Sequence, residues 1–176
     1  MKKTLAIILC LALIMSLLGS VSVSAEEAAA GPVAYLMYAD AAWASQYWGG
    51  NAPEGVTALN AAIDGAGSYT VGLEFAEAAE GLAFTALGIT DGEKSLPGYT
   101  IELKAIRVNG EDIAFTKGYT SSDDGITTRM NIYNEWVGEV PEDARSFDGR
   151  TEDAAAVIVD KEAFASVTSV EVDFTL

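Results

Sequence analysis

The sequence predicts an all-β fold, an antiparallel β-sandwich or jelly roll of about nine strands with little helix. Apolar and polar residues alternate in several segments, which is typical of strands that bury one face. Segments with helical spacing are short. Turn-forming pairs with glycine separate the alternating segments: Asp64-Gly65, Asp91-Gly92, Asn109-Gly110, Asp124-Gly125 and Asp148-Gly149.

Several strands carry specific local signals. The residues on either side of Asn109-Gly110 predict a β-hairpin. The parity of the apolar residues changes inside 99–108, which indicates a β-bulge near Lys104-Ala105 or burial of both faces. Asp160 is placed to cap a short helical turn that ends at Phe164. The nine expected strands cover 33–39, 56–63, 69–75, 82–90, 99–108, 112–117, 126–133, 154–160 and 169–176.

The first 25 residues have the three parts of an export signal. Met1-Lys2-Lys3 is positively charged, Leu5 to Leu18 is apolar, and Val23-Ser24-Ala25 is a small-residue cleavage pattern. We expect a signal peptide over 1–25, a short leader over 26–32, and one secreted domain over 33–176. The apolar stretch is shorter than the roughly 20 residues that cross a bilayer, so we expect no membrane insertion after cleavage.

The composition excludes several classes of function. The chain has 10 Lys and Arg, 26 Asp and Glu, and no His. Removal of Lys2 and Lys3 with the signal would leave a charge of 8 − 26 = −18, which disfavours nucleic acids and anionic membrane surfaces as partners. Without His, the usual catalytic triads and imidazole-bound zinc are excluded. The single Cys10 lies inside the signal, so we expect no disulfide in the mature domain.

The segment over 126–136 holds the first candidate binding residues. On a strand over 126–133, Arg129, Asn131 and Tyr133 would share one face, and Asn134 and Trp136 follow at its end. A guanidinium group, carboxamides and aromatic rings are the groups that sugar hydroxyls and ring C–H faces require. The alternative is that Arg129 pairs with one of the many acids and that Trp136 closes the end of the core.

A second aromatic group lies earlier in the chain, at Trp43, Tyr47 and Trp48. Trp43 and Tyr47 would share a face in a helix, whereas Trp48 and the glycines after it favour a loop. Exposed aromatic rings on a loop suit stacking against a pyranose ring. Closure of one end of the core is the other interpretation.

Because the chain has no His and Cys10 lies in the signal, a metal site would need oxygen ligands. Calcium is the first candidate for such a site. No segment matches the spacing of an EF-hand loop. A structural calcium held by Asp91, Glu93, Asp123 or Asp124 is one interpretation of the acids near the turns. The other is that these acids are solvated and cap their own turns.

Glycoside hydrolysis is the one enzymatic reaction that the composition readily allows, because it needs only two carboxylates. Nothing in the sequence selects such a pair among 26 acids. We therefore expect a protein that is not an enzyme.

Three segments resemble carbohydrate-binding modules of the galactose-binding-like jelly-roll type. Gly67, Tyr69 and Val71 match a Gly-x-Tyr-x-Val strand, and the stretch from Ile106 to Gly110 matches an Ile-x-Val-Asn-Gly hairpin. A regular last strand over 167–174 completes the resemblance. It implies sugar contacts from a sheet face or loop rim, and often a structural calcium, but it identifies no individual contact residue.

Together these features predict a secreted, non-catalytic carbohydrate-binding protein. The competing interpretation is an extracellular surface interaction or assembly protein, in which the same aromatic residues bind a protein partner.

Overall fold

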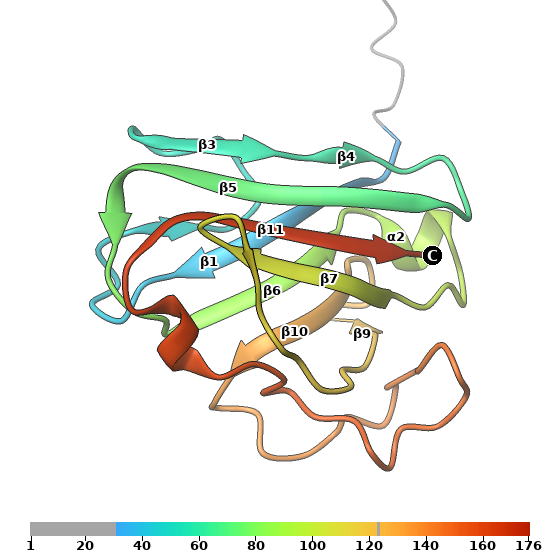
Figure 1. Cartoon of the computed structure of the whole chain (residues 1–176). Helices are drawn as coiled ribbons and strands as arrows, with labels where there is room; N and C mark the ends of the chain where they lie inside the picture. Colours follow the sequence, from blue (N-terminus) through green and yellow to red (C-terminus); the bar gives the residue numbers. More distant parts are fainter. Residues whose placement is uncertain (1–30, 123) are drawn as a thin grey trace, which may run out of the picture. The chain divides into compact units, whose positions relative to one another are not determined.

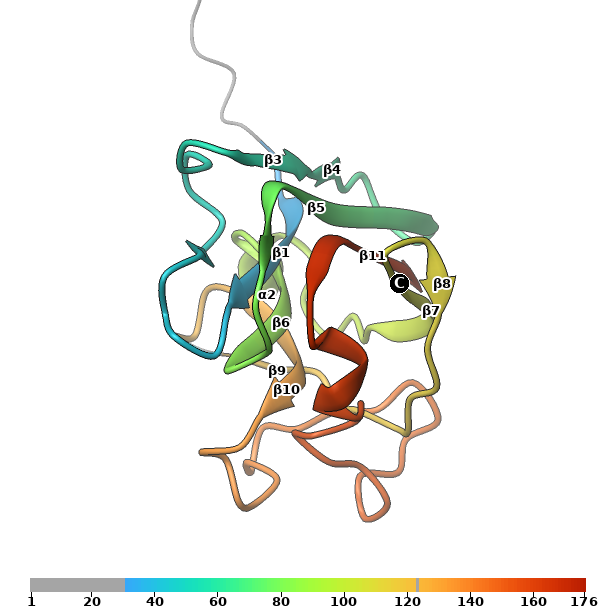
Figure 2. The same ribbon diagram turned by 60° about the vertical axis from the view of Figure 1, so that its left-hand side comes forward.

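Strands far apart in the sequence pair into two antiparallel sheets that pack face to face, which confirms the predicted β-sandwich (Figures 1 and 2). The computed structural model describes residues 31–122 and 124–176, so the expected signal peptide over 1–25 lies outside the described residues. The first sheet has the order β2-β1-β6-β10-β9, with β4 also paired to β1. Its strands are β1 (Val33–Ala39), β2 (Gln46–Tyr47), β4 (Ala61–Ala62), β6 (Phe84–Ile89), β9 (Ser121–Ser122) and β10 (Thr128–Asn134).

The second sheet has five strands in the order β3-β5-β11-β7-β8. The long strands β5 and β11 pair over most of their lengths and form its centre. The strands are β3 (Val56–Leu59), β5 (Ser68–Ala79), β7 (Glu102–Val108), β8 (Glu111–Asp112) and β11 (Val167–Thr175).

The main hydrophobic core lies between the two sheets. Every second residue of β1 points into it, and Leu36 and Tyr38 are fully buried there. The opposite sheet contributes Val172 and Phe174 from β11, whose burial alternates as the sequence predicted. This alternation arises because successive side chains of a strand point to opposite faces.

The predicted hairpin and bulge are both confirmed. Asn109 and Gly110 have φ values of 54° and 83°, and they connect β7 to β8 in the two-residue turn that such a pair favours. The register between β7 and β11 shifts next to Lys104, where the change of parity indicated a bulge.

Two of the expected strands are largely wrong. Of 112–117, only Asp112 lies in a strand, within β8, and 154–160 contains no regular strand. Isolated bridges join Phe115 to Val159 and Tyr133 to Val157, so these segments form a loop layer below the sheets (Figure 1). Eleven strands therefore occur among the described residues, several of them only two residues long.

The helices are short. The α2 helix (Gly92–Ser95) follows β6, and the η1 turn (Lys161–Phe164) precedes β11. The Asp160 side chain accepts a hydrogen bond from the Glu162 amide at 3.0 Å, which confirms the predicted cap. None of the helices in 31–122 and 124–176 is long and apolar enough to cross a membrane.

Candidate functional site

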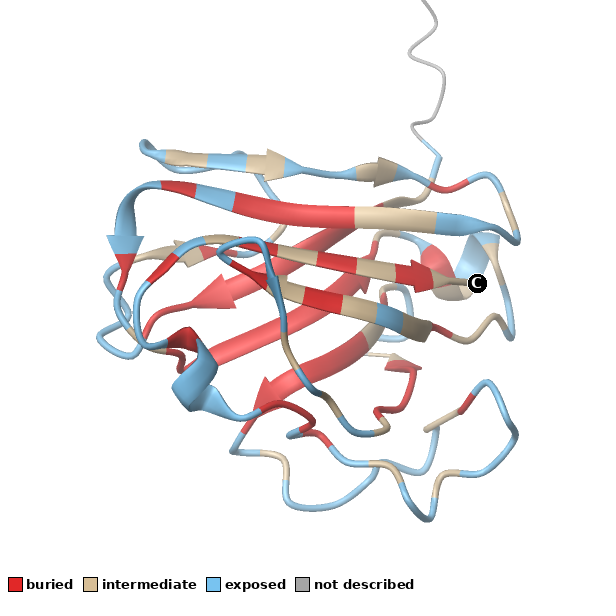
Figure 3. Cartoon of the chain, viewed as in Figure 1, coloured by how far each residue is buried: buried red, intermediate tan, exposed pale blue. Residues whose placement is uncertain are grey.

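The outer face of the six-stranded sheet carries a second hydrophobic cluster, separate from the main core. Tyr35, Met37 and Ala39 alternate with the core residues of β1, so they point away from the other sheet. They are nonetheless buried. Figure 3 shows β1, β6 and β10 buried along almost their whole lengths, whereas burial alternates along β11.

The strand register places this outer face in three cross-strand rows. Tyr35 lies opposite Gly88 and Arg129 follows on β10; the next row is Met37, Ala86 and Asn131, and the last is Ala39, Phe84 and Asn134. Apolar groups therefore occupy β1 and β6, while polar groups occupy β10. The outer face of this sheet therefore has an apolar part over β1 and β6 beside a polar part over β10.

The loop after β2 covers part of this face. A Cβ on Gly49 would collide with the Tyr35 ring, and a Cβ on Gly88 would lie 2.7 Å from Tyr35 Cζ. The Tyr35 ring therefore packs between two glycines, one on the sheet and one in the loop. Gly49 also has φ of 87°, which a residue with a side chain rarely adopts.

Three exposed tryptophans form a cluster on the Phe84 ring. The Trp48 ring stacks on Phe84 with centroids 5.3 Å apart, and on Trp43 with centroids 6.1 Å apart. Trp136 lies 5.7 Å from Trp43. Trp43, Trp48 and Trp136 are 42%, 46% and 59% exposed, which contradicts the interpretation that Trp136 closes the core. We call these three residues the tryptophan cluster.

The carboxylate of Asp40 holds the loop that presents Trp43. Asp40 is 4% exposed, and its oxygens accept hydrogen bonds from the amides of Ala42, Ala44 and Ser45 at 3.1, 2.8 and 2.9 Å. Trp43 itself has φ of 59°, the left-handed region that non-glycine residues seldom occupy. The loop is thus fixed by one buried side chain.

A shallow pocket of about 290 Å³ adjoins the tryptophan cluster; because most of its lining residues carry a polar group, we call it the polar pocket. Arg129 links the two regions, because it lines the pocket and its guanidinium carbon lies 5.0 Å from the centroid of the Phe84 ring. The described residues that line the pocket include no carboxylate. They are Tyr119, Ser121, Ser122, Arg129, Asn131, Asn134, Val137 and Pro141.

Hydrogen bonds order the polar groups of this pocket. Arg129 Nε donates to Asn131 Oδ1 at 3.1 Å, and Asn131 Nδ2 donates to the Tyr119 hydroxyl at 3.4 Å. Asn134 Nδ2 also donates to Asn131 Oδ1, and Asn134 Oδ1 accepts from the Trp136 amide at 3.3 Å. The polar pocket and the tryptophan cluster are therefore joined through Asn134.

Two of the predicted site residues lie in the main core instead. The expectation that Tyr133 shares a face with Arg129 and Asn131 is wrong, because the register against β6 shifts after Asn131. This bulge turns Ile132 and Tyr133 both inward. Burial raises the pKa of Tyr133, and so does its hydrogen bond to Glu135.

Tyr47 is the second of these residues, and its ring is almost fully buried. Its segment forms strand β2 rather than a helix, so Tyr47 and Trp43 do not share a helical face. The structure brings together Trp43, Trp48, Arg129, Asn131, Asn134 and Trp136.

Two of the acids proposed as calcium ligands, Glu93 and Asp124, have protein partners. Glu93 Oε1 accepts from the Thr128 hydroxyl at 2.8 Å and pairs with Arg145 at 2.6 Å. Asp124 caps its own turn, and hydrogen bonds from the amides of Thr127 and Ile126 lower its pKa. Asp91 precedes α2, and Asp123 lies outside the described residues. Within 31–122 and 124–176, no three acidic residues gather as a metal site would require.

Sequence reasoning missed several residues of this region. Phe84 lies in an expected strand, but the sequence does not indicate which of its faces is covered. Tyr119, Ser121 and Ser122 reach the pocket because β9 pairs with β10, and β9 was not predicted. Asp40 before a short loop could have been identified as a turn-capping residue.

Comparison with known proteins gives no relative: no family model, curated protein or solved structure matches the chain.

Proposed function

We propose that this protein is a secreted, non-catalytic carbohydrate-binding protein whose site consists of the tryptophan cluster and the adjoining polar pocket. The observation that carries this proposal is that exposed indole rings lie beside an ordered group of amides, hydroxyls and one guanidinium. The Trp136 backbone amide bonds Asn134, and Trp48 and Arg129 both pack on the Phe84 ring. A sugar presents the matching surfaces, because its ring has an apolar C–H face and its edge carries hydroxyl groups.

The energy of binding would come from two sources. Stacking of the apolar C–H face of a sugar on an exposed indole removes apolar area from water, which contributes about 25 cal/mol per Å². Hydrogen bonds to the pocket add directional specificity, and those from a charged group such as Arg129 are the stronger ones. Asn131 and Asn134 are nearly buried, so their amides are held in place before a ligand arrives.

The chemistry of the lining supports the proposal of binding without catalysis. Hydrolysis of a glycosidic bond uses two carboxyl groups beside the bond, and the described residues that line the pocket include none. The nearby carboxylate of Asp143 accepts the Ser122 amide at 2.7 Å. The β-sandwich also agrees with the resemblance to galactose-binding-like carbohydrate-binding modules.

The direct test is a titration of tryptophan emission with a panel of soluble oligosaccharides and plant polysaccharides. We expect at least one ligand to change the emission, and Trp136→Ala to weaken that change while the melting temperature stays within a few degrees. A flat response across the whole panel would contradict the proposed function.

A protein partner is the second candidate, and the exposed tryptophans favour it specifically. Tryptophan is enriched among the residues that dominate protein interfaces, and three clustered indoles would form such a centre. Light scattering would then show self-association that Trp136→Ala removes. A monomer that binds saccharides would exclude self-assembly through this cluster.

Calcium binding stays a prediction that a simple measurement tests. If calcium stabilises the turns near Asp91 and Asp124, EDTA should lower the melting temperature and added calcium should restore it. An unchanged melting temperature would show that calcium does not stabilise this domain.

A further inference from the structure

We propose that the site binds a single uncharged glycan chain, with one sugar unit in the polar pocket and the next unit against Trp136, and not the flat face of a crystalline polysaccharide. This inference rests on the proposed carbohydrate-binding function and specifies the physical form of its ligand.

The stacking of the tryptophan rings determines how many ring faces remain accessible to a ligand. Trp48 stacks on Phe84 and on Trp43, with interplanar angles of 29° and 20°, so its faces are largely occupied by protein. Trp43 also contacts Trp136, at an interplanar angle of 43°. Trp136 is the most exposed of the three.

A flat crystalline surface needs several coplanar rings side by side. The tryptophan cluster is instead a stack that rises from Phe84, and its last ring is tilted against the one before it. A planar surface would therefore touch only the outermost ring. One sugar unit on Trp136 matches this geometry.

The polar pocket adds a place for a second, neighbouring unit. Its volume of about 290 Å³ lies just below the range of about 300–1,000 Å³ for small-molecule sites, so it suits one sugar ring rather than several. Asn134 and Val137 line the pocket and flank Trp136 in the chain. The segment over 134–137 therefore connects the two places directly.

The charges favour an uncharged sugar. The polar groups in the pocket are amides and hydroxyls apart from Arg129, which already bonds Asn131 and packs on Phe84. Asp143 lies beside the pocket at the Ser122 amide, and Glu135 is bonded to Tyr133 next to Trp136. A uronate would meet these carboxylates and a domain of strongly negative charge.

The experiment is calorimetric titration of the chain over 26–176 with neutral oligosaccharides of one to six units, derived from β-glucan, xylan, mannan and chitin. Sedimentation with crystalline cellulose and crystalline chitin is measured in parallel. For the series that binds, we expect affinity to rise about tenfold from one unit to two, and then to change less than about threefold.

Two variants and a control distinguish binding in the polar pocket from binding against Trp136. Trp136→Ala should remove the gain from the second unit and leave single-unit affinity within about twofold. Asn131→Asp keeps the shape but replaces the amide donor with a charge, and it should weaken single-unit binding about tenfold or more. Phe147→Ala is the matched control, because Phe147 is 52% exposed and lies outside the site.

The outcomes separate this inference from the proposed function. Sedimentation with a crystalline polysaccharide that soluble oligosaccharides fail to compete would overturn the single-chain inference alone. Preference for an oligouronate over the neutral series would overturn the inference of an uncharged ligand and leave the proposed carbohydrate-binding function standing. Absence of binding to every saccharide would overturn both, and equal loss in Phe147→Ala would remove the assignment to Trp136.

Discussion

The two outer faces of the sandwich have opposite characters, although both belong to antiparallel sheets over one core. The face of β1, β6 and β10 carries the buried residues Tyr35, Met37 and Phe84, with Gly49 packed on Tyr35 and Trp48 on Phe84. The tryptophan cluster and the adjoining pocket are the parts of this region described above that reach solvent.

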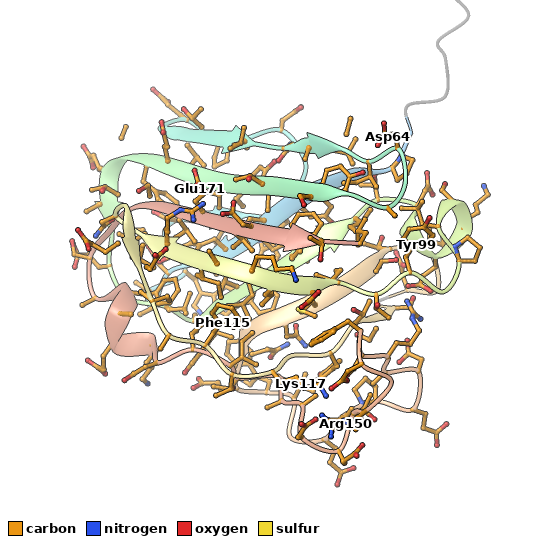
Figure 4. All side chains as sticks on the ribbon, turned by 45° about the vertical axis from the view of Figure 1, so that its right-hand side comes forward. Asp64, Tyr99, Phe115, Lys117, Arg150 and Glu171 are labelled. Atoms are coloured by element: carbon orange, nitrogen blue, oxygen red, sulfur yellow. The ribbon has the colours of Figure 1, made fainter. Side chains whose placement is uncertain are left out.

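The face of β5, β11 and β7 is polar and open. Arg107 bonds Glu171 through Nε at 2.8 Å and Asp173 through a terminal nitrogen at 2.8 Å, and Thr70 also bonds Asp173. Glu171 stands on the outer side of β11 in this arrangement (Figure 4). This is the solvated face that an antiparallel sheet commonly has.

The difference indicates where function is to be sought. A sandwich needs only one buried face per sheet, so the second apolar face of β1, β6 and β10 adds burial that the fold itself does not require. Partly exposed apolar patches rimmed by polar groups mark interaction sites in soluble proteins. In the charged loops around Lys117 and Arg150, Asp148 pairs with both cations, and its pKa is lowered, first by Lys117 (Figure 4).

The largest expected difference between the faces is in packing. Phe84→Ala should lower the free energy of unfolding by about 3–5 kcal/mol, because it removes a buried ring beneath Trp48 and Arg129. Leu59→Ala on the opposite face should cost about 1 kcal/mol or less, because Leu59 is 50% exposed. Urea unfolding measures both. Equal costs would mean that the outer face of β6 is not a packed layer.

The next effect concerns the loop that presents Trp43. Asp40→Ala should destabilise the protein by about 2–3 kcal/mol, because three amides lose a charged acceptor. Tryptophan emission should shift to longer wavelength as the cluster loosens. Asp112→Ala is the control on the other face, where the side chain is 80% exposed and 3.9 Å from Arg107, and we expect it to be nearly neutral. An Asp40→Ala protein with native emission would show that the loop does not depend on this carboxylate.

The smallest effect concerns the charged face. Burial acts to raise the pKa of Asp173, but the hydrogen bonds from Thr70 and Arg107 outweigh it, so the pKa lies below its ordinary value of 3.8. A lowered folded-state pKa contributes stability above the unfolded value, and this contribution is lost as the pH falls through the folded value. Asp173→Asn should therefore cost less than about 1 kcal/mol at pH 7, and the cost should be smaller at pH 2. Thermal unfolding at the two values checks this, and a cost that does not fall at low pH would show that charge is not its origin.

Much of the fold was predictable because its signals are local. Alternation along β11 depends only on neighbouring residues, and the turn at Asn109-Gly110 depends on the backbone freedom of two residues. The bulge beside Lys104 was also visible, as a change in parity.

The candidate site was predictable only in part. The sequence predicted Trp43, Trp48, Arg129, Asn131, Asn134 and Trp136, which the structure brings together from two distant segments. Tyr133 was misplaced because its bulge arises from pairing with β6, and no residue type in β10 signals that shift. Phe84 was missed because burial on an outer sheet face depends on a loop from elsewhere in the chain.

The sequence by itself determined the fold class, because alternating strands and glycine turns predict a β-sandwich, and it supplied the amides, hydroxyls, guanidinium and aromatic rings of the candidate site. These properties follow from residue type and short-range spacing. Only the tertiary structure decided which face carries the candidate site. Strand register and loop docking join residues about ninety positions apart, such as Trp43 and Trp136, and their contact follows from the free energy of the whole fold rather than from local preference.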